Sequence, residues 1–324
     1  MLNATIKWIS SDNRNERWME FKENHQLLTC CRSTDMGNQC VAGVSPAAIF
    51  VCAWPSGVPP VNSSPVSNRL KQKWALVTGA SSGFGAETAR QLADLGVNLL
   101  LGARREDRLA QVAAECQERG AGSAHIHRLD VSDTVSVNAF AEWAKATAGR
   151  VNVLINNAGG AHGVDRVEDG HDADWEAMFQ SNALGILRVS RAILPLMKPY
   201  SGGIIINVGS IAGRVAYEGG SAYCASKAAE HSITKTLRLE LNGTGLRVGT
   251  IDPGMAETEF SMVRLKGDKQ KADAVYAGVE PLTAGDVAEA IVWAANRPPH
   301  VCIDEILMMC TAQAAPYKVH RTEE

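Results

Sequence analysis

From residue 71 onward, short apolar runs alternate with stretches in which apolar residues recur every three or four positions. Short apolar runs are typical of buried strands, and the wider spacing is typical of helices with one face on a core. The pattern predicts seven strands, at residues 73–78, 97–102, 123–128, 151–155, 203–208, 246–251 and 301–308. It predicts helices at residues 83–95, 106–119, 133–147, 175–197, 221–241 and 283–295.

The order of these elements indicates the fold class. The strands alternate with helices, and most are continuous apolar runs without period-two alternation. Such strands are buried on both faces, as in a parallel sheet covered by helices on each side. Right-handed crossovers then predict an α/β, doubly wound, Rossmann-type sheet in a single domain over residues 71–324. Ligands of such sheets bind at the carboxyl ends of the strands, where the strand order reverses.

Residues 1–70 follow neither period. They end in a segment rich in Pro, Ser and Gly, residues 55–68, which is unsuited to a lasting helix or strand. We expect this N-terminal extension to be disordered or weakly structured. An alternative is that it is an artefact of the start site, with natural translation beginning further along the chain.

Composition narrows the class of protein. The net charge is −3, and no basic cluster points to nucleic acid or to a membrane surface. The eight cysteines include no CxxC pair, and no ligand set emerges from His125, His127, His162 and His171, so we expect no metal. No secretory signal is evident, and the apolar run 41–54 is too short to cross a bilayer. We expect a cytoplasmic protein with a small-molecule substrate and free thiols.

A glycine-rich turn follows the first predicted strand and leads into a helix. Glycines permit a tight turn and close backbone approach to a pyrophosphate, and the N–H groups at the helix start favour an anion. The strand–turn–helix context therefore predicts a dinucleotide site. Its contacting residues are expected to be Gly79, Ser81, Ser82, Gly83, Phe84 and Gly85.

The end of the second predicted strand indicates which dinucleotide is bound. A site for NAD carries an acidic residue here, which binds the ribose hydroxyls. This chain has Arg104 and Arg105 instead. Two guanidinium groups favour a 2′-phosphate by charge and by geometry. We predict NADP as the cofactor, and the alternative is that both arginines are solvated residues at a helix start.

Tyr223 and Lys227 carry the candidate acid–base chemistry. They lie four residues apart and so share one face of the predicted helix 221–241. A nearby ammonium stabilises a phenolate, which makes a tyrosine usable as an acid and a base. Ser210 follows the fifth predicted strand, where its hydroxyl can hold a substrate oxygen as charge develops on it.

Taken in order, these motifs resemble the short-chain dehydrogenase/reductase family over roughly residues 73–310. The spacing Gly79-x-x-x-Gly83-x-Gly85, the later Asn-Asn-Ala-Gly motif and the pair Tyr223 and Lys227 carry the resemblance. It implies a catalytic set of Asn182, Ser210, Tyr223 and Lys227, in which Asn182 organises a helix bend and a proton-relay water. It implies cofactor contacts from Tyr223 and Lys227, and also from Asp130, Val131, Asn157, Ala158, Gly159, Pro253 and Gly254.

The implied reaction is hydride transfer between a nicotinamide and a carbon that bears a hydroxyl or carbonyl oxygen. The segment after Pro253-Gly254 and the ending Val-His-Arg are similar to NADP-dependent 3-hydroxy acid dehydrogenases, which include serine and L-allo-threonine dehydrogenases. This resemblance implies a 3-hydroxy acid or 3-oxo acid as substrate. Its carboxylate would need a basic partner, and the candidates by charge are Arg214, Arg264 and Lys266, each of which could equally be a solvated surface residue.

Two alternatives remain open on the sequence. One is a broader carbonyl or 3-oxoacyl reductase of the same family, and the other is a non-catalytic NADP-binding protein. The resemblance also implies assembly into a homotetramer or homodimer.

Overall fold

The computed structural model describes residues 4–10, 17–23, 26–34, 37–41 and 67–322. The chain divides into two units, Met1–Val66 and Ser67–Glu324. In the first unit, four strands pair in sequence order as an antiparallel sheet: β1 (Ala4–Ser10), β2 (Arg17–Glu23), β3 (Gln26–Thr34) and β4 (Gly37–Val41).

These four strands differ from our expectation of little regular structure before residue 70. Neighbouring antiparallel strands pair through backbone hydrogen bonds, and such pairing needs no apolar run that a sequence pattern would reveal. Most of the linker-like segment 55–68 lies outside the described residues. The alternative that the extension is an artefact of the start site stays a prediction.

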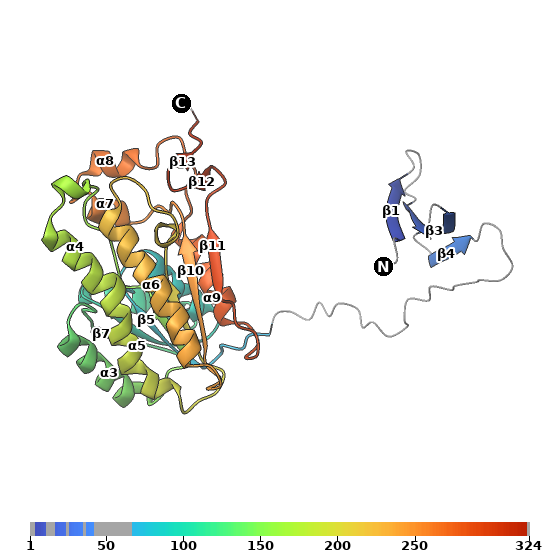
Figure 1. Cartoon of the computed structure of the whole chain (residues 1–324). Coiled ribbons are helices and arrows are strands. Elements are labelled where there is room, and N and C mark those ends of the chain that lie inside the picture. The colour runs from blue at the N-terminus through green and yellow to red at the C-terminus, as the bar shows by residue number, and fades with distance from the viewer. Residues whose placement is uncertain (1–3, 11–16, 24–25, 35–36, 42–66, 323–324) are drawn as a thin grey trace. The chain divides into compact units, whose positions relative to one another are not determined.

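A seven-stranded parallel sheet forms the centre of the second unit, as the sequence predicted (Figure 1). Its order is β11-β10-β9-β8-β5-β6-β7. The first of these strands along the chain, β5, lies inside the sheet, and the strand order reverses between β5 and β8. The strands are β5 (Trp74–Thr78), β6 (Asn98–Ala103), β7 (Ser123–Arg128), β8 (Val153–Asn156), β9 (Ile204–Val208), β10 (Arg247–Pro253) and β11 (Glu305–Met308). The last strand is shorter than the predicted 301–308.

Helices cover both faces of this sheet. One face carries α1 (Gly83–Asp94), α2 (Glu106–Glu118) and α9 (Ala284–Ala295). The other carries α3 (Thr134–Ala148), α5 (Gly185–Met197) and α6 (Ser221–Glu240), and Figure 1 shows α5 and α6 in front of the sheet. The predicted single helix 175–197 is interrupted, because a π-helical turn, Gln180–Leu184, separates α4 (Asp172–Phe179) from α5.

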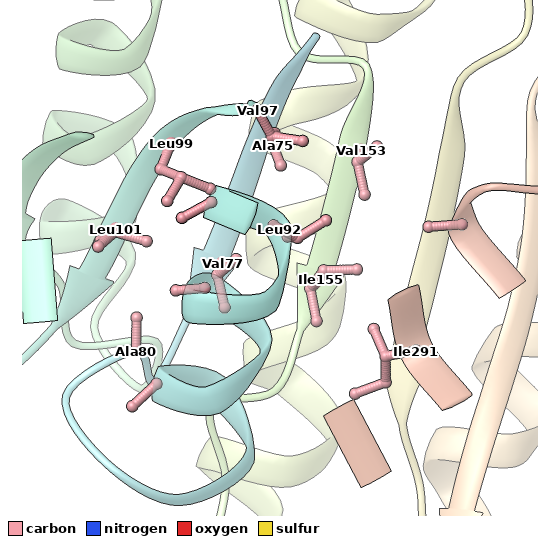
Figure 2. Packing of buried hydrophobic residues seen from close by; sticks show 14 of the residues in the cluster. Ala75, Val77, Ala80, Leu92, Val97, Leu99, Leu101, Val153, Ile155 and Ile291 are labelled. Carbon is pink, nitrogen blue, oxygen red and sulfur yellow. The ribbon is translucent and has the colours of Figure 1, made fainter. Parts of the chain in front are cut away.

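Two hydrophobic clusters fill the spaces between the sheet and its helices. Successive residues of a strand point to opposite faces, so Val77 joins one cluster and Leu76 the other. Figure 2 shows residues of the first cluster, among them Val77 of β5, Leu92 of α1 and Ile291 of α9. Continuous apolar strands are required because both sides of the sheet are buried.

Several short elements escaped prediction. They are α7 (Phe260–Arg264), α8 (Lys269–Ala274), β12 (Gln313–Ala315), β13 (Lys318–Val319) and the 3₁₀ turns Val167–Asp169 and Ile211–Gly213. Elements of two to six residues are too short to display a period. Of the helices described, none is long and apolar enough to cross a membrane.

We expect Leu92→Ala to destabilise the second unit by about 2–5 kcal/mol, because Leu92 is fully buried between α1 and the sheet. Leu239→Ala is the matched control, since this helical leucine is 77% exposed, and it should cost less than about 0.5 kcal/mol. Urea unfolding followed by near-UV circular dichroism measures both. Equal losses in the two variants would contradict the packing described.

Candidate active site

The predicted site residues lie on loops that leave the carboxyl ends of neighbouring strands. The glycine-rich turn follows β5, Asn157 follows β8, Ser210 follows β9 and Gly254 follows β10. In a parallel sheet these ends share one edge, and the strand order reverses between β5 and β8 at this edge. The topology therefore gathers the candidates where a doubly wound sheet binds its ligand.

The turn after β5 packs so closely that only glycine fits at two positions. A Cβ atom on Gly79 would lie 2.8 Å from Nδ2 of Asn157, and one on Gly85 would lie 2.5 Å from the carbonyl oxygen of Gly79. Gly79 and Gly83 also adopt φ values of +66° and +54°, which disfavour any other residue. At Gly83 a Cβ would meet only Thr258, at the ordinary contact distance of 3.6 Å, so the backbone conformation and not lack of space favours glycine there.

Asn157 joins this turn to the neighbouring loop. Its Nδ2 donates to the carbonyl oxygens of Thr78 at 2.9 Å and Gly79 at 3.3 Å. The backbone N–H groups of Asn157 and Ala158 both donate to Oγ1 of Thr78, at 3.0 Å. Its neighbour Gly159 has no room for a Cβ, which would lie 2.6 Å from Oδ1 of Asn182. The Asn-Asn-Ala-Gly motif thus fixes the ends of β5 and β8 together.

Arg105 reaches back to the glycine-rich turn, and Arg104 is exposed beside it. The Arg105 guanidinium donates to Oγ of Ser82 at 2.7 Å and to Oγ of Ser81 at 3.3 Å. It also pairs with Glu259 at 3.0 Å, and Arg108 pairs with the same carboxylate. A guanidinium and two serine hydroxyls form a set of donors suited to a phosphate.

The loop after β7 holds Asp130 and Val131 in different surroundings. Oδ1 of Asp130 accepts the backbone N–H of Ser132 at 3.0 Å. Burial opposes ionisation, but the hydrogen bonds from Ser132 and the nearby arginines outweigh it and lower the pKa of Asp130. Val131 is buried against Gly185, where a Cβ would lie 2.9 Å from its side chain. Asp130 thus keeps its charge in this loop, and Val131 packs against the start of α5.

Gly254, after Pro253 at the end of β10, packs against the C-terminal part of the chain. A Cβ on Gly254 would lie 2.2 Å from Oε1 of Gln313, and that same oxygen accepts the N–H of Met255 at 2.7 Å. Gln313 is buried, and no sequence signal pointed to it. It anchors the start of the segment that carries Glu259 and Arg264.

Asn182 lies inside the π-helical turn between α4 and α5 and is buried. Its Nδ2 donates to Oγ of Ser226 at 3.0 Å and to the carbonyl oxygen of Gly160 at 2.9 Å. Its Oδ1 accepts the N–H of Gly160 at 2.9 Å. This one side chain connects the loop after β8 to the helix that carries Tyr223.

Ser210 and Tyr223 stand on adjacent elements. Oγ of Ser210 accepts the N–H of Ala212 at 3.1 Å, so its hydroxyl hydrogen is free to donate elsewhere. Tyr223 lies in the first turn of α6 and is 8% exposed. Its ring packs on Phe260 with centroids 5.6 Å apart, and it lines a pocket together with His162 and Trp175.

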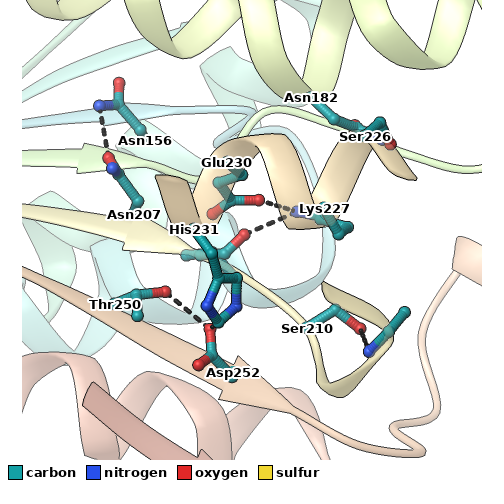
Figure 3. A network of polar contacts seen from close by, with 12 residues as sticks. Asn156, Asn182, Asn207, Ser210, Ser226, Lys227, Glu230, His231, Thr250 and Asp252 are labelled. Atoms are coloured by element: carbon teal, nitrogen blue, oxygen red, sulfur yellow. Dashed lines mark hydrogen bonds and ion pairs between the residues drawn. The ribbon is translucent and has the colours of Figure 1, made fainter. Parts of the chain in front are cut away.

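Lys227 follows one turn later on α6 and is buried. Its Nζ donates to the carbonyl oxygen of Val208 at 2.8 Å and to Oε2 of Glu230 at 2.7 Å (Figure 3). The motif predicted Lys227 but not Glu230. A Glu three residues after the lysine is the only signal that the sequence held, and it resembles an ordinary helical ion pair.

A second buried charge lies below the Ser210 loop, at Asp252 of β10. Its carboxylate accepts hydrogen bonds from Oγ1 of Thr250 at 2.7 Å and from Nε of Arg214 at 2.9 Å. Nε2 of His231 lies 3.2 Å from the same carboxylate. Burial would raise the pKa of Asp252, but these partners outweigh it and lower the pKa. Arg214 also pairs with Glu305 at 2.7 Å. Arg214 is thus paired with two acidic side chains of this chain.

Arg264 is the basic candidate nearest to Tyr223. Its guanidinium carbon lies 5.6 Å from the ring centroid of Tyr223 and 5.5 Å from that of Tyr217. It donates to the Tyr217 hydroxyl at 3.0 Å and to the carbonyl oxygen of Gly163 at 3.2 Å. Lys266, by contrast, pairs with Asp174 at 2.8 Å. Within residues 67–322, no acidic side chain forms an ion pair with Arg264.

Comparison with known proteins places this arrangement in a family. Residues 73–269, more than half of the chain, match the model of the short chain dehydrogenase family. An NADP-dependent 3-hydroxy acid dehydrogenase of Schizosaccharomyces pombe is 43% identical over 257 residues, which cover 79% of this chain and 99% of the relative. Sulfoacetaldehyde reductase 2 of Chromohalobacter salexigens is 43% identical, covering 74% of this chain and 94% of the relative.

A solved structure gives the same result. A serine dehydrogenase in its closed form with NADP⁺ superposes with a TM-score of 0.72 at 37% identity, over 77% of this chain and all of the other. The similarity therefore extends to the arrangement of the elements as well as to the motifs.

We expect Arg105→Ala to lower kcat/KM for NADPH at least about tenfold and to change it little for NADH, because a charged hydrogen bond contributes about 1.5–3 kcal/mol. The control is Arg119→Ala, since Arg119 lies just beyond the opposite end of α2 and pairs with Asp94. Steady-state kinetics with both cofactors measures the change. A parallel loss for NADH and NADPH would show that Arg105 does not read the 2′-phosphate.

Proposed function

Because this chain belongs to the short-chain dehydrogenase family, we propose that it moves a hydride between NADP and a small 3-hydroxy acid such as serine or L-allo-threonine. The observation that carries the substrate class is Arg264, whose cation lies over the ring of Tyr223 without an acidic partner among the residues described. A buried or half-buried cation beside an acid–base group favours a substrate that bears an anion.

The residues at the strand ends fit the dinucleotide. The glycine-rich turn leads into the N-terminus of α1 at Gly83, and Arg105, Ser81 and Ser82 offer donors for the 2′-phosphate. When bound, NADP supplies the hydride donor or acceptor at its nicotinamide. We assign the remaining contacts to Phe84, Arg104, Asp130, Val131, Asn157, Ala158, Gly159, Pro253 and Gly254, and to Tyr223 and Lys227.

The side chains of the site have different roles in the proton transfer. Tyr223 takes the proton of the substrate hydroxyl in oxidation and returns one to the carbonyl in reduction. Ser210 donates its free hydroxyl hydrogen to the same substrate oxygen. The Lys227 ammonium stabilises the phenolate, and Asn182 holds the π-helical turn next to Ser226 on α6.

Two kinds of anion fit the proposal. The relatives are named for a 3-hydroxy acid and for sulfoacetaldehyde, which bears a sulfonate. Arg264 can bind a carboxylate or a sulfonate through the same N–H groups. The carboxylate is the primary proposal, because the structural neighbour is named for serine.

A substrate panel tests the proposal directly. With NADP we expect oxidation of L-serine, L-allo-threonine or 3-hydroxypropionate, with kcat/KM at least about tenfold above that of the methyl ester, since the ester forfeits one charged contact. Sulfoacetaldehyde with NADPH tests the sulfonate. Preference for a bulky ketone or a thioester would favour a broad carbonyl reductase instead, and NADPH binding without turnover would favour a non-catalytic protein.

We expect Arg264→Met to raise KM for the acid about tenfold or more while KM for its ester stays within about twofold, because only the acid loses a charged contact. Methionine retains much of the apolar length, so packing on Tyr223 is preserved. The control is Lys269→Met, since Lys269 is exposed and pairs only with Asp273 among the residues described. If acid and ester respond equally, Arg264 does not bind the carboxylate.

A further inference from the structure

The lysine of the site has an acidic neighbour. Glu230 lies on α6 three residues after Lys227, and its side chain is fully buried. Two donor positions of the Lys227 ammonium are used, one on Glu230 and one on the carbonyl oxygen of Val208 (Figure 3). The second oxygen of Glu230 is buried and lacks a hydrogen-bond partner among the residues that the structure describes.

We propose that Glu230 is a positioning residue for Lys227: its carboxylate holds the ammonium on the Val208 side of the site and offsets part of the charge that Lys227 supplies to Tyr223. This inference rests on the proposed function of Tyr223 and Lys227. The acid–base behaviour of Tyr223 then depends on whether Glu230 is ionised.

Burying an ionised carboxylate costs free energy unless a cation or hydrogen-bond donors offset the loss of hydration. Burial raises the pKa of Glu230 to about 7, although the adjacent Lys227 ammonium favours the ionised form. For Lys227, burial works against the charged form, and the attraction of Glu230 outweighs it, so the pKa is raised. Glu230 can therefore change its charge near neutral pH while Lys227 keeps its own.

The other charged groups around the pair act more weakly or already have partners. Asp252 of β10 disfavours a second negative charge at Glu230, and His231 of α6 favours it. Asp252 is bound by Arg214, which follows the Ser210 loop. Asn182, from the π-helical turn, carries no charge. Lys227 is thus the only cation in direct contact with Glu230 in the described part of the chain.

The direction of the effect follows from the charges. Above about pH 7 Glu230 is ionised, and its charge offsets part of the positive charge of Lys227, which interacts with Tyr223. The phenolate is then less stabilised, and oxidation requires a higher pH. Below that pH a protonated Glu230 leaves the lysine charge uncompensated.

The test is the pH dependence of oxidation by the full chain with NADP. Glu230→Gln keeps an oxygen that can accept a hydrogen bond from Lys227 but removes the negative charge. The acid limb of the kcat/KM profile should therefore move by about one pH unit to lower pH, which corresponds to about a tenfold higher rate on that limb. Glu230→Asp keeps the charge and should move it less. Glu240→Gln is the matched control, because Glu240 ends the same helix in an exposed position.

A second measurement needs no substrate. Infrared difference spectra should show a carboxyl proton that is lost near pH 7 in the wild type and in Glu240→Gln but is missing in Glu230→Gln. An unmoved acid limb, an equal loss of rate at every pH, or identical behaviour of Gln and Asp at position 230 would overturn the proposal. If no acid is oxidised, the proposed substrate class fails, and the infrared result still tests whether Glu230 changes its charge near pH 7; the absence of that change would overturn the proposal.

Discussion

The candidate site depends on the hydrogen bonds of Thr78, which join the carboxyl ends of β5 and β8. Its buried Oγ1 donates to the carbonyl oxygen of Ile155 at 3.3 Å and accepts the N–H groups of Asn157 and Ala158. Asn157 returns a bond to the carbonyl oxygen of Thr78. These contacts close the ends of β5 and β8, where the strand order reverses. They also hold the backbone of the glycine-rich turn in place, because glycines have no side chains that could form such contacts.

A chain of buried amides extends this order toward α6. Nδ2 of Asn156 donates to Oδ1 of its cross-strand partner Asn207 at 2.8 Å, and Asn207 donates in turn to Oγ1 of Thr234 at 2.8 Å. Asn182 adds a second connection through Ser226. Such bonds favour one arrangement, since a slip of the strands would deprive Nδ2 of Asn156 and Nδ2 of Asn207 of their acceptors. The helix that carries Tyr223 and Lys227 is therefore fixed relative to the sheet by polar bonds as well as by packing.

The segment after β10 serves both ends of the site. Glu259, which precedes α7, pairs with Arg105 and Arg108, and Arg264, at the end of α7, lies over the ring of Tyr223. Gln313 anchors the beginning of the segment. Loops held by a rigid sheet commonly carry the groups that read a ligand.

The sequence by itself determined the architecture and the motif residues. Continuous apolar strands and helical spacing predicted the seven-stranded parallel sheet, because burial on both faces constrains every residue of those strands. The glycine turn and the pair Tyr223 and Lys227 were predictable because each is defined by neighbours a few residues apart. The paired strands before residue 42 were not, since their residues show no sustained alternation of apolar and polar positions.

Only the tertiary structure decided which distant side chains meet. Arg214, Arg264 and Lys266 were equivalent by charge, and the fold separated them by giving Arg214 to Asp252, Lys266 to Asp174 and Arg264 to the Tyr223 ring. Local spacing did not distinguish Glu230 from other helical acids, and the fold buries it against Lys227. The physical reason is that burial and charge pairing depend on contacts between elements far apart in the chain, which local spacing does not encode.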